Sequence, residues 1–260
     1  MVRLSIPAIF AIFVGVLAFR LGVAPLLGIA EPVQRVIESA AAVGAIAAAV
    51  SFDRDDPPFR PWTTLAVALA MVPLARLALW SGWMLGDAKA GHIFLILSNI
   101  LCIGAITGFR RVLVSTGLTS EWTPSARSGA GLVMLAVAAA VLGLLVYQVV
   151  GLLPLQERSP GDLIAGLVNI LSTFCDGILC AGGLLLVWLV RPMLGGSVAL
   201  PYVLVAFGGA VFLIVDIFHV LFHTTTQDQF GSPLPIAVAT VGWVALALSG
   251  LSQRLLVRTG

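Results

Sequence analysis

The feature of this sequence that most limits its fold is a series of long apolar runs separated by short polar connections. Each run has about 20 residues, and at ~1.5 Å rise per residue a helix of that length crosses the ~30 Å hydrocarbon core of a bilayer. Only 10% of the residues are charged and 60% are hydrophobic, which is too few polar side chains to cover a water-facing surface. Backbone groups in lipid must bond within their own segment, so the runs are predicted to be helices.

Eight such segments can be drawn, and they predict an all-α polytopic transmembrane bundle that forms one integral membrane domain over residues 1–260. The predicted spans are roughly 5–29, 34–52, 62–85, 91–109, 128–153, 163–190, 199–223 and 234–255. Prolines, glycines and charged residues punctuate the connections between them. The short alternating strands typical of a transmembrane barrel are not found in the sequence.

The basic residues of the connections are distributed unequally between the two sides of the membrane. When the spans alternate in direction, one side carries Arg3, Arg54, Arg60, Arg110, Arg111, Arg127, Arg191, Arg254 and Arg258. The other side carries Arg35, Lys89 and Arg158. Cytoplasmic connections are enriched in basic residues, so we expect both termini in the cytoplasm. The expected location is the cytoplasmic (inner) membrane of a bacterium.

Several polar residues lie inside the predicted spans, where they are energetically costly and mark candidate functional sites. The predicted ligand-binding residues are Arg20, Arg76, Asn169, Asp176 and Asp216. With the topology above, most of the polar residues lie in the outer half of the bilayer. An unpaired charge at such depth costs about 3 kcal/mol or more, so the two arginines are expected to face the aspartates or an anionic ligand. The alternative is a salt-bridge network that only sets helix register.

Helical periodicity groups these residues further. Asn169, Thr173, Asp176 and Cys180 form one stripe on the sixth span, and Asp216, His219 and His223 form another on the seventh. Stripes of this kind predict a polar interior or a cavity that opens to the outside.

Three histidines form a candidate metal site. His219 and His223 are four residues apart on one helical face, and His92 comes from the same side of the membrane. Three imidazoles, with Asp216 as a further ligand, suit zinc or another divalent metal. A b-type haem is the second possibility, with His92 and either His219 or His223 as axial ligands.

The same three histidines resemble the metal ligands of the intramembrane hydrolases that include alkaline ceramidases and adiponectin receptors. That family also uses a late-span HxxxH and an earlier histidine, and the resemblance implies a metal-dependent membrane enzyme. In the family a serine precedes the earlier histidine by one helical turn, where this chain has Ala88. The family's site also faces the cytoplasm, whereas this one faces outward in the predicted topology. The resemblance is confined to three residues.

The most charged connection runs from Asp53 to Arg60 and contains two adjacent prolines. It is predicted to be a stiff cytoplasmic turn, with Trp62 as an anchor at the membrane interface. The alternative is a docking surface for a cytoplasmic or membrane partner protein.

Net charge indicates the expected partners, and the positions of the cysteines indicate their expected state. A formal charge of +2 without a basic patch predicts no nucleic-acid binding, so the expected partners are the lipid bilayer and a small ligand or ion. The three cysteines, Cys102, Cys175 and Cys180, lie in apolar runs and are expected to be buried free thiols.

No motif in the sequence specifies a reaction. The pattern of Arg, Asp and His favours binding or transport of a small ligand or ion in the outer leaflet. The alternatives are a metal- or haem-dependent membrane enzyme, a receptor or sensor, and a structural subunit of a membrane complex.

Overall fold

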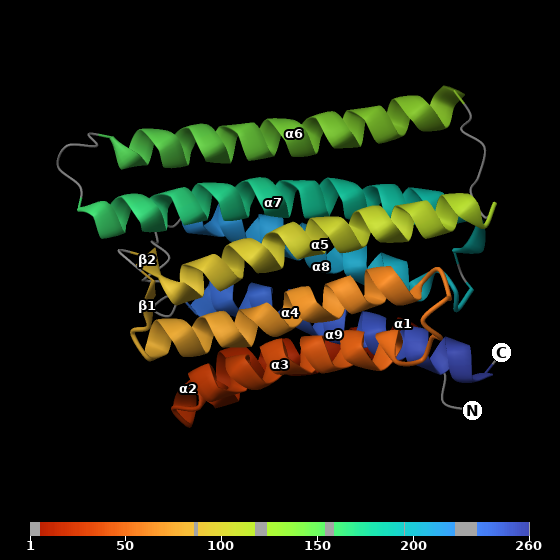
Figure 1. Ribbon diagram of the computed structural model, residues 1–260, viewed down its shortest axis with the longest axis horizontal. Coiled ribbons are helices and arrows are strands. Elements are labelled where there is room, and N and C mark those ends of the chain that lie inside the picture. Colours follow the sequence, from red (N-terminus) through yellow and green to blue (C-terminus); the bar gives the residue numbers. More distant parts are fainter. Residues whose placement is uncertain are drawn as a thin grey trace.

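The computed structural model describes residues 6–85, 88–117, 124–153, 159–194, 196–221 and 233–259, and these residues are almost entirely helical (Figure 1). The first helical run comprises α1 (Ile6–Ala18), the π-helical turn η1 (Phe19–Val23) and α2 (Ala24–Leu26). The others are α3 (Ala30–Ala49), α4 (Phe59–Trp80), α5 (Ala90–Ser115), α6 (Pro124–Leu152), α7 (Pro160–Val190), α8 (Leu200–Leu221) and α9 (Pro233–Thr259). Every predicted span therefore corresponds to a helical run, and the all-helical prediction is confirmed.

A short hairpin of two strands and a 3₁₀ turn were not predicted. Strands β1 (Met84–Leu85) and β2 (Ala88–Lys89) pair in an antiparallel hairpin between α4 and α5, and the 3₁₀ turn η3 (Arg191–Met193) follows α7. Gly82, with a φ of 69°, ends α4 before residues 84 and 85, which were predicted to continue the third span. A side chain at this φ would be strained, so glycine makes this turn possible.

Seven of the described helical runs are long and apolar enough to cross a membrane, which indicates an integral membrane protein. The exception among the eight is α3, which carries Glu31, Arg35 and Glu38 in its first half. Its 20 residues are nevertheless long enough for a span, and it packs between α4 and α9.

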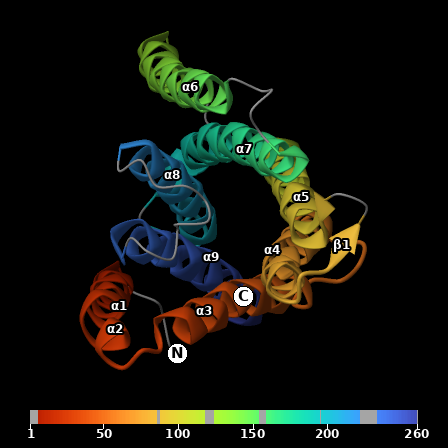
Figure 2. The same ribbon diagram turned by 90° about the vertical axis from the view of Figure 1, so that its left-hand side faces the viewer.

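The long helices alternate in direction, so the bundle has two distinct ends (Figure 1). We call the end with β1 and β2 the hairpin end, and the end where α1 begins and α9 ends the termini end. Viewed along the bundle, six helices form a closed ring in the order α3, α4, α5, α7, α8 and α9 (Figure 2). Outside the ring, α6 packs mainly on α7 and α1 packs on α9. The interior cavity described below is lined by residues of five of these six helices, α4, α5, α7, α8 and α9.

Close backbone contact joins α3 to α9. A Cβ atom on Gly44 would lie 2.5 Å from the carbonyl oxygen of Ala247, and one on Gly250 would collide with the backbone of Gly44. Small residues allow this approach, which membrane helices use because lipid supplies no hydrophobic force between them.

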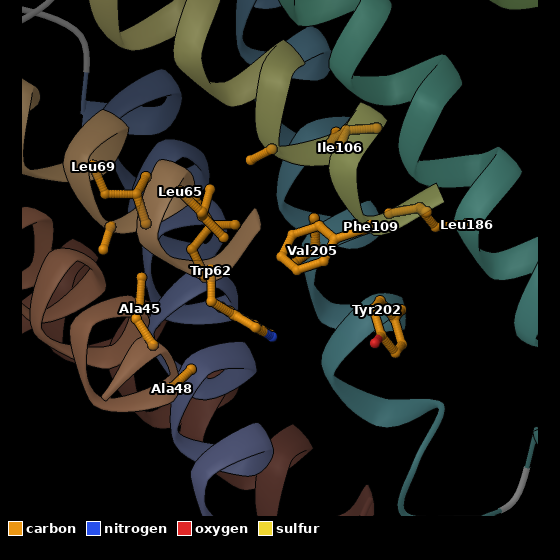
Figure 3. Packing of buried hydrophobic residues seen from close by; sticks show 14 of the residues in the cluster. Ala45, Ala48, Trp62, Leu65, Leu69, Ile106, Phe109, Leu186, Tyr202 and Val205 are labelled. Carbon is orange, nitrogen blue, oxygen red and sulfur yellow. The ribbon is translucent and has the colours of Figure 1, made fainter. Parts of the chain in front are cut away.

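Apolar packing dominates the half of the ring nearer the termini end (Figure 3). The ring centroid of Phe109 lies 4.9 Å from that of Trp62 and 5.7 Å from that of Tyr202, and both pairs are edge-to-face. Trp62 is completely buried. Its predicted role as an interface anchor is therefore wrong, because the first turn of α4 directs its side chain onto Phe109 inside the bundle.

Candidate functional site

Polar side chains from seven helices gather in the half of the bundle nearer the hairpin end, opposite the aromatic packing of Figure 3. Helices α3, α5, α7 and α9 begin at this end, and α4, α6 and α8 finish there. Six of the residues lie in the adjoining half of their helices, and the seventh, Asp176, lies at the middle of α7: Glu38, Arg76, Asn99, Gln148, Asp176, Asp216 and Thr240.

A cavity of about 150 Å³ lies inside the ring, and we call it the interior cavity. Apolar side chains form much of its wall, including Phe212 and Trp243, whose ring centroids are 4.7 Å apart. Six residues add polar or thiol groups: Arg76, Ser98, Asn99, Cys102, Ser172 and Asp176. Few polar groups in a mainly apolar cavity are typical of a site for a small ligand or ion.

Two carboxyl groups meet at the edge of the interior cavity. The side chain of Asp176 on α7 contacts that of Asp216 on α8, and Asp216 also contacts Thr173. Oδ2 of Asp216 is buried and has no hydrogen-bond donor in the described part of the chain. Two ionised carboxylates in contact repel each other strongly in a low-dielectric interior. The pair is therefore stable only when a proton or another cation lies between the two groups.

Hydrogen bonds hold the polar face of α7 against its neighbours. Gln148 donates from Nε2 to Oγ1 of Thr173 over 2.8 Å, and Asn99 donates from Nδ2 to Oγ of Ser172 over 3.2 Å. The first bond joins α6 to α7 and the second joins α5 to α7. Together they set the rotation of α7 and so direct Asp176 toward the cavity.

A second polar chain crosses α4, α3 and α9. Arg76 Nη2 lies 3.5 Å from Oε1 of Glu38, and the same oxygen accepts a 3.0 Å hydrogen bond from Nε2 of Gln34. Oγ1 of Thr240 in turn donates to Oε1 of Gln34 over 2.7 Å. Glu38 is completely buried, yet its Oε2 has no hydrogen-bond partner among the described residues. An unbonded oxygen on a buried carboxylate is costly and marks a place where a ligand can bind.

Glu38 is the acidic residue that the sequence analysis missed. Arg76 was expected to face Asp176, Asp216 or an anionic ligand; it forms an ion pair with Glu38 and lines the interior cavity together with Asp176. The available signal was the spacing of Gln34 and Glu38, four residues apart on one helical face. Glu38 lies inside the predicted span 34–52, but it was not selected among the polar residues of the spans.

A second cavity, of about 220 Å³, lies between α3 and α4, and we call it the vestibule. Its polar lining comes from Glu31, Gln34, Arg35, Glu38 and Arg76, with Leu79 and Trp80 beside them. Glu31 and Arg35 form an exposed ion pair near the start of α3. Arg76 lines both the vestibule and the interior cavity.

The remaining predicted ligand-binding residues lie apart from Arg76. Arg20 is buried in the π-helical turn η1, which contacts α9, and its Nε has no hydrogen-bond partner in the described ranges. No ion pair joins Arg20 to a described acidic residue, so the expected pairing with Asp176 or Asp216 is not seen there. Asn169 lies on α7, two turns before Asp176 and closer to the hairpin end, and it is partly buried.

The predicted metal site is only partly described. His92 lies in the first turn of α5, and His219 follows Asp216 by about one turn on α8, while His223 lies outside the described residues. Among the described residues, no group of three or more His, Cys, Asp or Glu side chains could hold a metal ion. The zinc and haem hypotheses thus remain predictions. Cys102, Cys175 and Cys180 are free, as expected.

The site therefore consists of a carboxyl pair and an interior cavity near the middle of the bundle, and a vestibule nearer the hairpin end. Comparisons with known protein families, with curated proteins and with solved structures give no match for this chain.

Proposed function

We propose that this protein binds a small cation, a proton or a monovalent metal ion, between Asp176 and Asp216, and transports a small ion or ligand through the interior cavity. The observation that carries the proposal is the contact between the two carboxyl groups beside that cavity. A positive charge is needed to stabilise the pair, and an exchangeable cation supplies it.

The surroundings of Asp176 support the same function. Asn99 and Ser172 add side-chain oxygens to the cavity, and hard cations prefer oxygen ligands. Arg76 adds a positive charge to the lining that Asp176 shares, so the cavity also suits a small ligand with charges of both signs. A site near the middle of the bundle, where α7 carries Asp176, is typical of secondary transporters.

The bias of basic residues supports a proposed orientation. Among the described residues, Arg54, Arg60, Arg110, Arg111, Arg191, Arg254 and Arg258 lie toward the termini end, and Arg35 and Lys89 toward the hairpin end. We propose that the termini end faces the cytoplasm of a bacterium and the vestibule opens outward.

A structural role is the second candidate, because hydrogen bonds between helices use several of these polar groups. Asn99, Gln148 and Gln34 each join two helices. In a purely structural subunit, however, the acid pair would bind no exchangeable cation, so the two candidates differ in a measurable property.

Thermal unfolding of the purified protein in detergent tests cation binding, because a ligand that binds the folded state raises the unfolding temperature. We expect a dose-dependent rise with one of Li⁺, Na⁺ or K⁺, or with protons when the pH is lowered. Asp176→Asn should abolish the rise, whereas Asp55→Asn, the same change in an exposed connection, should keep it. A rise that persists in Asp176→Asn, or no rise with any of these cations, would contradict the proposal.

A further inference from the structure

Arg76 is the side chain that the vestibule and the interior cavity have in common. It lies on the last turns of α4, with the vestibule on the α3 side and the interior cavity on the α5 and α7 side. A ligand that moves from one cavity into the other on the Arg76 side therefore meets this guanidinium.

Glu38 holds Arg76 in that position. Its Oε1 lies 3.5 Å from Nη2 of Arg76, and Gln34 fixes the same oxygen through a 3.0 Å hydrogen bond. Gln34 is itself anchored to α9 by Thr240. The carboxylate that positions Arg76 is thus attached to two helices and does not depend on the mobility of a surface side chain.

The second oxygen of Glu38 makes this arrangement responsive to a ligand. Glu38 is completely buried, it lines the vestibule, and its Oε2 has no hydrogen-bond partner among the described residues. A cation or a hydrogen-bond donor in the vestibule can bind this oxygen and compete with Arg76 for the carboxylate. Release of Arg76 would join the two cavities.

We propose that the vestibule between α3 and α4 is the access route for small cations to the interior cavity, and that the Arg76–Glu38 ion pair is its gate. The inference rests on the proposed function in one respect, that the interior cavity is where the transported species binds. It adds the route to that cavity, the residue that closes it, and the class of ligand, a small cation, that opens it at Glu38.

The native thiol of Cys102 lines the interior cavity and reports access to it. In the background Cys175→Ser/Cys180→Ser, purified protein is exposed to Ag⁺, a small thiol-reactive cation. The Cys102 thiol that remains free is then alkylated after denaturation and quantified by mass spectrometry. We expect Cys102 to react slowly with Ag⁺ when Arg76 is present. In Arg76→Ala the rate should be about tenfold or more higher, because the arginine side chain no longer blocks the route. Glu38→Gln, which weakens the ion pair while keeping its shape, should also raise the rate.

Two controls separate a gate from a general loosening of the fold. Cys180 packs among residues of α6, α7 and α8 and lines neither cavity. In the background Cys102→Ser/Cys175→Ser, Cys180 is the thiol that remains. The rate of its reaction with Ag⁺ should change by less than about twofold when Arg76→Ala is added. Arg54→Ala, which removes an exposed arginine that lines neither cavity, should leave the Cys102 rate within the same limit. An equal rise at Cys102 and Cys180, or no rise at Cys102, would overturn the gate.

Failure of the gate and failure of the proposed function give different results. If Asp176→Asn abolishes the cation-dependent stabilisation while Arg76→Ala leaves the Cys102 rate unchanged, the gate is wrong and the carboxyl site stands. If Arg76→Ala opens the route while Asp176→Asn changes no cation response, the gate stands and the proposed function is wrong.

Discussion

Arg76 Nη2 lies 3.5 Å from Oε1 of Glu38, and this ion pair links α4 to α3 at the place where two cavities adjoin. Both charges are removed from water to different degrees, since the Glu38 side chain is 1% exposed and that of Arg76 is 29% exposed. A buried ion pair of this kind is weak evidence for added stability, because desolvation offsets the attraction. Loss of one partner is more informative, because it leaves the other charge uncompensated.

The first prediction concerns this pair. Glu38→Ala should lower the free energy of unfolding by about 3–5 kcal/mol, because it removes the buried carboxylate that pairs with Arg76. Arg76→Ala should also destabilise the protein. The double variant should be more stable than the sum of the two losses predicts, by about 1–3 kcal/mol. Chemical unfolding in detergent gives the free energy of unfolding of the native protein, the two single variants and the double variant. Strictly additive losses would show that the two side chains do not interact.

The second prediction concerns the contact of α3 with α9. Gly44→Ala should lower stability by about 1–3 kcal/mol, because the new Cβ would meet the backbone of Ala247. Gly143→Ala is the matched control, since a Cβ there meets nothing within 4 Å. The control should be neutral or more stable by up to about 1 kcal/mol, because alanine is the better helix former. Equal effects of the two substitutions on the unfolding midpoint would contradict the close approach.

The third prediction concerns the hydrogen bond between α9 and α3. Thr240→Val keeps the shape of the side chain and removes the donor to Gln34, so we expect a loss of about 0.6–1.7 kcal/mol. Thr107→Val is the control, because the Thr107 hydroxyl is exposed and bonds to Ile103 of its own helix. Thermal unfolding of the two variants should separate them. A Thr107→Val protein as destabilised as Thr240→Val would argue against a specific role of the interhelical bond.

The fourth prediction concerns orientation. In a background with all three cysteines replaced by serine, Asp55→Cys places a thiol at the termini end and Met84→Cys places one at the hairpin end. Both positions are exposed. A membrane-impermeant thiol reagent should label Met84→Cys in intact cells and Asp55→Cys only after lysis. The opposite pattern would reverse the proposed topology, and labelling of both sites in intact cells would contradict α4 as a membrane span.

Much of the fold could be predicted because the bilayer imposes a length on every helix. All eight predicted spans coincide with helical runs, including α3, which is the least apolar. The order of helices in the ring could not be predicted, since it depends on contacts such as Gly44 against Ala247 that helical periodicity does not specify. Periodicity correctly predicted that Thr173 and Asp176 share a polar face of α7, but not that α8 brings Asp216 against Asp176.

The candidate site, like the fold, could be predicted from the sequence only in part. Arg76 and Asp176 could be selected as intramembrane charges, and the structure places both on the interior cavity. Glu38 could not be selected with equal ease, because its importance depends on burial against α4 and α9. The π-helical turn around Arg20 has no sequence signal that we can identify, and it directs Arg20 into the bundle next to α9.

The central claim is that the Asp176–Asp216 pair binds a cation that the protein transports. Ion flux into proteoliposomes, followed with pH-sensitive and Na⁺- or K⁺-sensitive dyes under an imposed gradient, tests it most directly. We predict flux by the native protein, loss of flux in Asp176→Asn and in Asp216→Asn, and unchanged flux in Asp55→Asn, with all variants equally well reconstituted. Flux that persists in both Asp176→Asn and Asp216→Asn, or no flux of any of these cations by the native protein, would contradict the account.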